Sequence, residues 1–549
     1  MGKNSERRES LVYHAKPKPG KIEVVPTKKY NSQRDLAIAY SPGVAIPCQE
    51  IEKDPSNVYK YTNKSNLVAV ISNGTAVLGL GDIGPDASKP VMEGKALLFK
   101  IFADIDVFDI EINEKDPDKF IEVVKSISTT FGGINLEDIK APEAFKIEKE
   151  LVDQLDIPVM HDDQHGTAII SAAALLNALD LVDKKIEDVK IVVSGAGAAA
   201  IACTKLYISF GAKLKNIVMT DSRGVINNLR DGLTKEKKFF ATSREIKTLE
   251  EAMVDSDVFI GLSMANIVSK KMLKSMSKDP IVFAMANPDP EINYDKAMSV
   301  RDDIIFATGR SDLPNQVNNV LGFPFIFRGA LDVRATKINE EMKKAAVVAL
   351  AELAKKPVPE QVNIAYDETK LSFGKDYIIP KPFDPRLISE IPPAVAKAAI
   401  DSGVAQEPIK DWDKYTQILD ERLGSNQKLI RIIHRRARKA KEKKLVFTEA
   451  DHLDVLKAAQ ICFEEKIAEP VLLGGKKIIK ELMESLDFNE DLQIIDPTDK
   501  LNKDLIDKYS QSLFKKLRRK GKTLDDVKRL LRGRDYFGSM MVENGDADC

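Results

Sequence analysis

The regular alternation of helix-like and strand-like segments after residue 166 limits the possible folds more than any other feature of the sequence. TAIISAAALLNALDLV predicts a buried helix, VKIVVSGAG a strand, and AAAIACTKLYISFGA a second helix. Further strands are predicted at NIVMTDSRG, DVFIGLS, PIVFAMANPDPE and DIIFATGRSD, each ending in small or polar residues. This alternation is typical of a parallel, doubly wound α/β sheet, which binds its ligand at the carboxyl ends of the strands.

The rest of the chain divides around this pattern. A chain of 549 residues is too long for one hydrophobic core, so several domains are expected. Residues 1–165 mix short apolar runs with turns and predict an N-terminal α/β domain, whereas residues 166–420 hold the doubly wound, Rossmann-type pattern. The polar stretch DSGVAQEPIKDWDK is interpreted as a linker, and residues 428–549 as a third, smaller α/β unit.

Composition excludes some classes of protein. The net charge of -1 argues against a dedicated nucleic-acid binder. No apolar run approaches the roughly 18 residues of a membrane span, and the charged start MGKNSERRES lacks the apolar core of a secretory signal. Cys48, Cys203, Cys462 and Cys549 are scattered, which favours reduced thiols over a disulfide scaffold. We therefore expect a cytoplasmic protein that binds neither nucleic acid nor membranes.

Two glycine-rich stretches resemble dinucleotide-binding loops. GLGDIG at residues 79–84 fits the pattern fully, but Pro85 and Pro90 follow it and are expected to block a helix. GAGAAA at residues 195–200 follows a strand and precedes a long helical pattern, which is the setting that a pyrophosphate needs. The second stretch is therefore the predicted cofactor loop, and GLGDIG a floor beside a site or a simple turn. The predicted cofactor-binding residues here are Gly195, Ala196, Gly197, Ala198 and Ala200.

The end of the next strand bears on the choice of cofactor. Asp221 lies where an acidic side chain would bind the ribose 2′-hydroxyl of NAD. Arg223, two residues further on, is instead suited to the 2′-phosphate of NADP. These residues leave the choice between NAD and NADP open.

Two acidic pairs follow apolar runs in GGINLEDIKAPEAFKIEKELVDQLDIPVMHDDQHGTA, residues 132–168. Glu137, Asp138 and Asp163 offer three carboxylates from two strand ends, and such hard oxygen ligands suit Mg²⁺ or Mn²⁺. His161 and His165 raise zinc as an alternative, although no cysteine stands nearby. A further reading makes these acids helix caps or solvated loop residues, and either Asp162 or Asp163 also fits a cap.

The motifs YSPGVA (residues 40–45), MEGKALLF, NLEDIKAP, HDDQHGTA, GAGAAA and NPDPEI occur in this order. Over residues ~10 to ~420 the chain resembles bacterial malic enzymes. VFTEADHLDVLKAAQ, EPVLLGG, IIDP and RDYFGSMMVENGDAD in the third unit resemble the first part of a phosphotransacetylase domain. The whole chain is thus similar to hybrid malic enzymes of the NADP-dependent type. We expect the third unit, which stops at Cys549, to be a truncated form of that domain.

This resemblance implies oxidative decarboxylation of L-malate to pyruvate, with Mg²⁺ or Mn²⁺ and with NADP or NAD. By motif match, Lys95 is the general base and Tyr40 the acid that protonates the enolate. Asp162 orients Lys95 or relays its proton. A lysine that is partly desolvated beside a cation is expected to have a lowered pKa. The metal ligands are again Glu137, Asp138 and Asp163. Asn287 and Asn319 are matched to hydrogen bonds with the substrate carboxylate or the nicotinamide ribose.

One position departs from the larger malic enzymes, which place an arginine just before the LGLGD segment to bind a substrate carboxylate. Ala76 stands there in this chain, so the residue that holds the C4 carboxylate of malate is open. The resemblance further implies NADP rather than NAD, a homo-oligomer, and an acetyl-CoA-type effector acting on the third unit. The basic run KLIRIIHRRARKAKEKK, residues 428–444, predicts an amphipathic helix with a solvated basic face. A catalytically silent assembly subunit is the alternative function.

Overall fold

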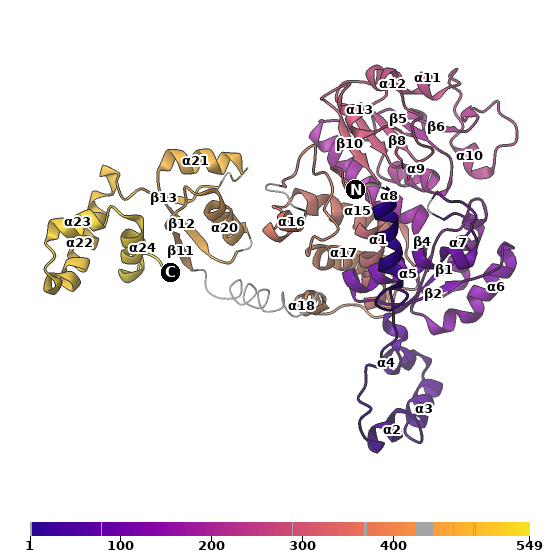
Figure 1. The fold of residues 1–549 in the computed structure, drawn as a ribbon, viewed down its shortest axis with the longest axis horizontal. Coiled ribbons are helices and arrows are strands. Elements are labelled where there is room, and N and C mark those ends of the chain that lie inside the picture. The colour runs from indigo at the N-terminus through magenta and orange to yellow at the C-terminus, as the bar shows by residue number, and fades with distance from the viewer. Residues whose placement is uncertain are drawn as a thin grey trace. The chain divides into compact units, whose positions relative to one another are not determined.

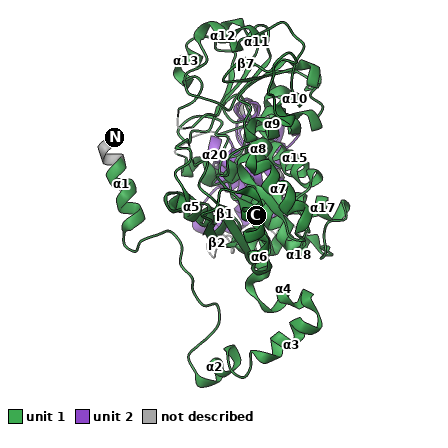
Figure 2. Cartoon of the chain, turned by 90° about the vertical axis from the view of Figure 1, so that its right-hand side faces the viewer, with its two compact units in different colours: residues 1–423 green, residues 424–549 purple. Residues whose placement is uncertain are grey.

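The computed structural model describes residues 3–77, 79–287, 289–366, 371–422, 443–464, 466–486, 488 and 490–549. The chain forms two compact units, residues 1–423 and residues 424–549 (Figure 2). Most of the predicted basic helix at residues 428–444 lies outside the described residues. The polar stretch interpreted as a linker belongs to the first unit, where the backbone N–H of Gln406 donates to the Val333 carbonyl at 3.0 Å.

The first sheet of this unit is parallel, with the strand order β2-β1-β3-β4. Its strands are β1 (Leu67–Ser72), β2 (Asp106–Glu111), β3 (Gly133–Leu136) and β4 (Val159–His161). The connections run through α5 (Pro85–Ala103), α6 (Pro117–Ile127) and α7 (Glu143–Gln154) (Figure 1). Every residue of β1 is buried, as expected for a central strand that helices cover on both faces. The predicted N-terminal α/β architecture is confirmed.

The second sheet has the order β10-β9-β8-β5-β6-β7. Its strands are β5 (Ile191–Ser194), β6 (Ile217–Asp221), β7 (Gly224–Val225), β8 (Val258–Gly261), β9 (Ile281–Ala284) and β10 (Ile305–Thr308). All pairs are parallel except β6 with β7. Because β5 lies between β6 and β8, the strand order reverses there, and a ligand crevice opens at such a reversal. The doubly wound sheet is confirmed.

Helix α8 (Asp162–Leu181) starts directly after β4 and leads into the second sheet. Most of its residues are buried, and it packs against α9 (Ala198–Ser209) and α15 (Glu340–Lys355). Helices α14 (Phe323–Asp332) and α17 (Leu387–Asp401) join the same hydrophobic core. The start of α8 is therefore a rigid position, because a large core holds the helix that carries it.

Pro85 is the first residue of α5 and Pro90 lies inside that helix, so the expectation that they block a helix after GLGDIG was wrong. Proline is tolerated in the first turn because its missing N–H would have no partner in the helix there. Gly84, the N-cap, has a φ of 82°, a conformation that favours glycine. The glycines of GLGDIG therefore shape the entry to α5.

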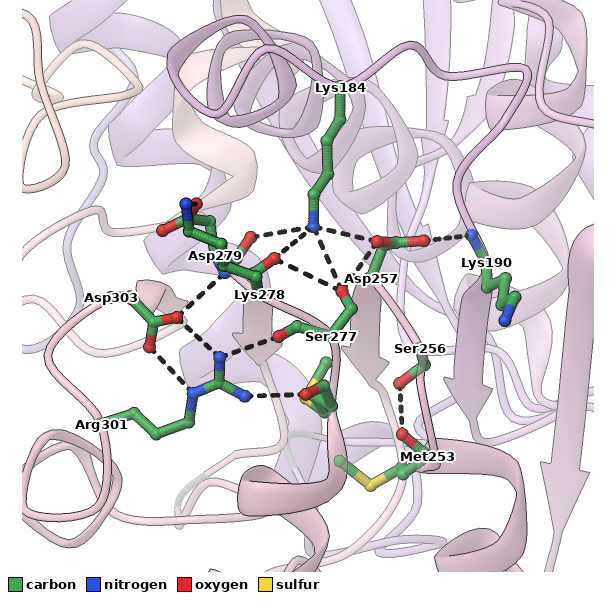
Figure 3. Close-up of polar contacts among 11 residues, drawn as sticks. Lys184, Lys190, Met253, Ser256, Asp257, Ser277, Lys278, Asp279, Arg301 and Asp303 are labelled. Atoms are coloured by element: carbon green, nitrogen blue, oxygen red, sulfur yellow. Dashed lines mark hydrogen bonds and ion pairs between the residues drawn. The ribbon is translucent and has the colours of Figure 1, made fainter.

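A polar network connects the amino ends of β5, β8, β9 and β10 (Figure 3). Lys184 donates from Nζ to Asp257 Oδ1 at 2.9 Å, and Ser277 Oγ donates to the same oxygen at 2.7 Å. Arg301 donates to both carboxylate oxygens of Asp303. These groups satisfy one another at the edge opposite the carboxyl ends of the strands, so this edge is structural.

The described residues up to Tyr61 form the α-helices α1 (Lys3–Ala15), α2 (Gln33–Ala39), α3 (Ala45–Lys53) and α4 (Val58–Tyr61). None of the residues in α2, α3 and α4 is buried. In two views at right angles, α2 and α3 stand apart from both sheets (Figures 1 and 2). Several large apolar side chains of this segment are exposed, including Tyr30, Leu36, Ile38 and Ile46.

The second unit contains a parallel sheet, β11-β12-β13. Its strands are β11 (Lys444–Phe447), β12 (Glu469–Leu473) and β13 (Gln493–Ile495). Its described residues also form the α-helices α20 (Leu453–Glu464), α21 (Lys476–Ser485), α22 (Lys503–Leu517), α23 (Leu524–Leu530) and α24 (Arg534–Glu543). Two clusters of buried apolar residues hold this α/β unit together. Within the described part of the chain, no helix combines the length and apolar character needed to cross a membrane.

Candidate active site

The two acidic pairs meet at one edge of the first sheet. Glu137 and Asp138 directly follow β3, and Asp162 and Asp163 open α8 directly after β4. Strands β3 and β4 are parallel neighbours, so their carboxyl ends lie side by side. In the described part of the chain, Glu137, Asp138 and Asp163 each offer a carboxylate oxygen, and these oxygens lie within 4.8 Å of one another.

This acidic cluster fits a hard divalent cation. Burial raises the pKa of Glu137 well above its ordinary value. The positive charge of Lys95 lowers this pKa, whereas the neighbouring carboxylates of Asp163 and Asp162 raise it further. A divalent cation would offset the repulsion between these carboxylates. The backbone N–H of Asp138 donates to Asp163 Oδ2 at 2.8 Å and thereby fixes one ligand of the set. The donor atoms suit Mg²⁺ or Mn²⁺ better than zinc, since neither histidine of HDDQHG belongs to the cluster.

Lys95 lies beside this cluster, on the buried face of α5. Its Nζ is 2.7 Å from Asp162 Oδ2 and 2.8 Å from Glu137 Oε1, and it stands 4.4 Å from the ring centre of Phe323. The lowered pKa expected for Lys95 from the sequence was wrong. Burial lowers the pKa, but the carboxylates of Asp162 and Glu137 outweigh burial and hold it above its ordinary value. Lys95 is therefore the charged partner of two carboxylates in this arrangement.

Asn319 completes the surroundings of Asp162. Its Nδ2 donates to Asp162 Oδ2 at 3.1 Å, and its Oδ1 accepts from Thr167 Oγ1 at 3.1 Å. Gly166 lies between them, and a Cβ there would overlap the Asp162 carboxylate. The close approach of Asn319 to α8 therefore requires glycine at this position. Thr167 and Gly166 were not predicted, although a glycine in the first turns of an apolar helix is an informative signal.

Glu148 of α7, whose side chain is 13% exposed, is a carboxylate that the sequence analysis missed. It accepts hydrogen bonds from the His161 backbone N–H at 2.8 Å and from Gln164 Nε2 at 3.2 Å, and lies 2.9 Å from His165 Nε2. Burial raises the pKa of Glu148, but His165 and other cationic groups outweigh burial and lower it to about 2. Glu148 thus holds the turn that presents Asp162 and Asp163. A signal existed, since Glu148 stands on the same helix face as the buried residues of α7.

The predicted cofactor loop opens into a cavity of about 820 Å³. Gly195, Ala196 and Gly197 line it. A Cβ on Gly195, whose φ is 116°, would overlap the Leu262 carbonyl. Gly197 is the N-cap of α9, Ala198 its first residue, and Ala200 is buried beneath the loop. Pro142, which follows Asp138 closely in the sequence, also lines the cavity. The cavity therefore extends from the cofactor loop to the segment that follows Asp138 of the acidic cluster. The glycine-rich loop at the N-terminus of α9 therefore fits a dinucleotide pyrophosphate.

Asp221 ends β6 at the wall of this cavity. Arg230 Nη2 lies 2.9 Å and Lys237 Nζ 3.0 Å from its Oδ2. Burial raises the pKa of Asp221, but the hydrogen bonds from Arg230 and Lys237 outweigh burial and hold the pKa well below its usual range. Arg223 contributes its backbone N–H to Asp221 Oδ1 at 2.9 Å, and the residue is exposed. The cations at Asp221 are therefore Arg230 and Lys237, which sequence reasoning missed.

Asn287 and Tyr40 are the two remaining predicted residues, and both are exposed. Asn287 follows β9 and is exposed, and a Cβ on Gly309 would lie 3.0 Å from its Oδ1. Tyr40 is the C-cap of α2 and is 77% exposed. Because α2 stands apart from α5 and α8 in both views, one chain does not bring Tyr40 to Lys95 (Figures 1 and 2).

Comparison with known proteins identifies the family of this chain. The sequence profile "Malic enzyme, N-terminal domain" matches residues 19–152, "Malic enzyme, NAD binding domain" matches residues 164–368, and "Phosphate acetyl/butaryl transferase" matches residues 428–549. The chain is 52% identical to the NADP-dependent malic enzyme of Escherichia coli (strain K12), over 99% of this chain and 72% of that protein.

Two further relatives differ from the Escherichia coli protein, one in its cofactor and the other in its size. An NAD-dependent malic enzyme of Rhizobium meliloti (strain 1021) is 46% identical over 99% of this chain and 71% of its own length. The crystal structure of a malic enzyme from Pyrococcus horikoshii has 41% identity and a TM-score of 0.71, covering 78% of this chain and 99% of that one. The chain belongs to the malic enzyme family, with a phosphate acetyltransferase-like domain at residues 428–549.

Proposed function

We propose that this chain catalyses the oxidative decarboxylation of L-malate to pyruvate and carbon dioxide, coupled to the reduction of NADP. The observation that carries the proposal is the position of Lys95, whose Nζ lies between Asp162 and Glu137 at the rim of the acidic cluster. The neighbouring cavity, lined by the glycines of the cofactor loop, supports the dinucleotide as the hydride acceptor.

Glu137, Asp138 and Asp163 would hold Mg²⁺ or Mn²⁺, which when bound polarises substrate oxygens and offsets negative charge that develops during the reaction. The charged Lys95 first passes a proton to Asp162, whose Oδ2 lies 2.7 Å from Nζ, and the neutral amine that results takes the proton of the malate hydroxyl. Asn319 keeps Asp162 oriented through its hydrogen bond to Oδ2. Asn287, at the end of β9, contributes an amide to the substrate or to the nicotinamide ribose.

NADP is the proposed cofactor because two cations surround Asp221. An unpaired carboxylate would repel a 2′-phosphate, but Arg230 and Lys237 together outnumber this single negative charge. Lys237 also lines the cavity and is mostly shielded from solvent. Family membership alone does not decide the cofactor, because both NADP-dependent and NAD-dependent relatives match this chain over nearly its full length.

Tyr40 serves as the general acid if it reaches the site of a second copy of the chain. Its segment supports this proposal, because Tyr40, Leu36 and Ile38 are exposed on helices without a buried residue. Exposed apolar surface of this kind marks an interaction site. The proposed active form is therefore a homo-oligomer. The acetyl-CoA-type effector remains a prediction for the second unit.

The first experiment follows the absorbance of the reduced nicotinamide with L-malate, Mn²⁺ and either NADP or NAD, with an EDTA control. Pyruvate formation that requires Mn²⁺ and is faster with NADP is the expected result. Folded protein without turnover on either cofactor would favour the silent assembly subunit instead. Faster turnover with NAD would retain the reaction and overturn the roles given to Arg230 and Lys237.

A further inference from the structure

The substrate proposed above has two carboxylates, and the site described so far accounts for only one of them. A cation in the acidic cluster is suited to the hydroxyl and the carboxylate beside it. Ala76 stands where an arginine would bind the second carboxylate, and its backbone N–H donates to the Asp138 carbonyl at 2.9 Å. This position borders the cluster without offering a side-chain charge. The C4 carboxylate therefore needs a cationic partner from another element.

We propose that Arg310 binds the C4 carboxylate, an inference that rests on L-malate being the substrate. Arg310 follows β10 directly after Gly309. A Cβ on Gly309 would lie 3.0 Å from Asn287 Oδ1, so the loops after β9 and β10 are in contact. Asp289, in the loop after β9, is close enough to interact electrostatically with Arg310.

The same loop leads from Arg310 to the catalytic cluster. It returns to β10, where the Val317 backbone N–H donates to the Thr308 carbonyl at 2.8 Å. Asn319 follows and donates to Asp162 Oδ2, the oxygen that Lys95 also contacts. Arg310 is thus placed in a loop whose one end touches Asn287 and whose other end contacts Asp162.

The loop is fixed in place, as a binding residue requires. Asn315 is 1% exposed, and its Nδ2 donates to the carbonyls of Phe306 at 2.9 Å and Lys375 at 2.6 Å. Its Oδ1 accepts from the Ile378 backbone N–H at 2.8 Å. Through these hydrogen bonds, the side-chain amide of Asn315 holds the part of the loop after Arg310 against β10 and against the segment near residue 377. The backbone of Arg310 is therefore positioned before a ligand arrives, which lowers the cost of binding.

The guanidinium itself is only half engaged. Arg310 donates from Nε to Asp312 Oδ1 at 2.9 Å and from Nη2 to Asp312 Oδ2 at 2.7 Å, so one edge of the fork is occupied. Within the described residues, Nη1 has no hydrogen-bond partner, and the side chain is 40% exposed. The second edge, formed by Nη1 and the remaining N–H of Nη2, matches a carboxylate in a bidentate arrangement. Asp312 therefore orients Arg310 and leaves that edge to a ligand.

Other cations are less suited to this role. Arg301 lies at the amino ends of the strands, and Arg328 is buried in a bidentate pair with Asp332. Lys95 lies between Glu137 and Asp162. Lys140, which is exposed and follows Asp138 closely in the sequence, is the strongest rival and is included in the test.

The test compares the binding of two ligands that differ only at C4. Calorimetry with the full chain, Mn²⁺ and NADPH would measure L-malate against L-2-hydroxybutyrate, which carries a methyl group in place of the C4 carboxylate. Arg310→Ala should weaken malate binding by about 10- to 100-fold, the range for a charge-assisted hydrogen-bonded pair, and leave hydroxybutyrate binding unchanged. Arg310→Lys should give an intermediate loss because it keeps the charge without the fork. Lys140→Ala should change neither ligand.

Three results would overturn the proposal: an equal loss for both ligands, no loss for either, or a malate-specific loss in Lys140→Ala instead. Because binding is measured without turnover, failure of the proposed function gives a different result. Wild-type protein that binds malate through Arg310 but yields no pyruvate would refute the decarboxylase and retain the subsite. Normal turnover in Arg310→Ala with an unchanged KM for malate would refute the subsite and retain the decarboxylase.

Discussion

Lys95 of α5 donates a hydrogen bond of 2.7 Å from Nζ to Oδ2 of Asp162, the first residue of α8. The two helices bring together residues that lie far apart in the sequence. Neither residue belongs to the set of three carboxylates that a metal ion would bind, yet Lys95 also contacts Glu137 of that set at 2.8 Å. A proton carrier and a metal ligand are therefore linked through one ammonium group.

Removing this ammonium should abolish catalysis without removing the metal. We expect Lys95→Ala to lower kcat by about 10²- to 10⁴-fold, the usual contribution of a general acid or base. Affinity for Mn²⁺ should be unchanged or higher, because the variant loses a positive charge next to Glu137. Steady-state rates and a Mn²⁺ titration measure the two quantities. Lys89→Ala, on the same helix but half exposed, is the matched control. A parallel loss of kcat and Mn²⁺ affinity would mean that Lys95 is structural.

Reversing the charge at the Asp221 end of the cavity should change the cofactor preference. Lys237→Glu places a negative charge beside Asp221 and should lower kcat/KM for NADP by about 10- to 100-fold, as expected for a lost charged hydrogen bond. The value for NAD should change little, since NAD has no 2′-phosphate. Lys235→Glu makes the same change at an exposed position of the same helix and should leave the ratio intact. An equal loss for both cofactors in Lys237→Glu would contradict the proposed phosphate contact.

The sequence alone predicted those parts of the site that depend on local pattern. The strand before Gly195 and the helix after Gly197 are short-range features, and the acids at 137, 138 and 163 directly follow apolar strands. Parallel strands bring their carboxyl ends to the same edge, so the acidic cluster follows from the fold class. The doubly wound sheet could be predicted for the same reason.

The parts that could not be predicted depend on contacts between distant segments. Arg230 and Lys237 contact Asp221 because the chain after β7 returns to the end of β6. The pKa of Lys95 is raised by two carboxylates, Asp162 and Glu137, which other elements contribute. Whether this pKa rises or falls therefore depends on how close these carboxylates lie, which the residue type alone does not reveal. The position of Tyr40 is a similar case, since a motif identifies the residue but does not say which copy of the chain it serves.

Glu148 offers a pH-dependent prediction. Its folded pKa of about 2 lies below the ordinary value of 4.5, so its contribution to stability is present above pH 4.5 and is lost as the pH falls towards 2. The shift corresponds to about 3 kcal/mol in favour of the charged, folded form. Glu148→Gln should therefore lower the urea midpoint at neutral pH, and the difference from wild type should shrink as the solution is acidified towards pH 3.

The same variant also tests whether Glu148 positions the acidic cluster. Because Glu148 holds the turn before Asp163, Glu148→Gln should weaken Mn²⁺ binding at neutral pH as well. Asp153→Asn, which removes the charge of an exposed carboxylate on α7, is the control for both measurements. A stability loss that is constant with pH, together with normal Mn²⁺ affinity, would show that Glu148 acts only through packing.

Mixed oligomers test whether Tyr40 serves a second copy of the chain. Tyr40→Phe and Lys95→Ala should each be inactive alone, because every site then lacks either its acid or its base. If Tyr40 enters the partner's site, a heterodimer of the two variants contains one site with both residues intact. Equal mixing after dissociation and reassembly should then restore about a quarter of the wild-type rate, since about half of the dimers are mixed and each has one working site. Mixing without dissociation is the control and should restore nothing. If Tyr40 acted within its own chain, each site of the mixed dimer would lack one residue, and reassembly would leave the protein inactive.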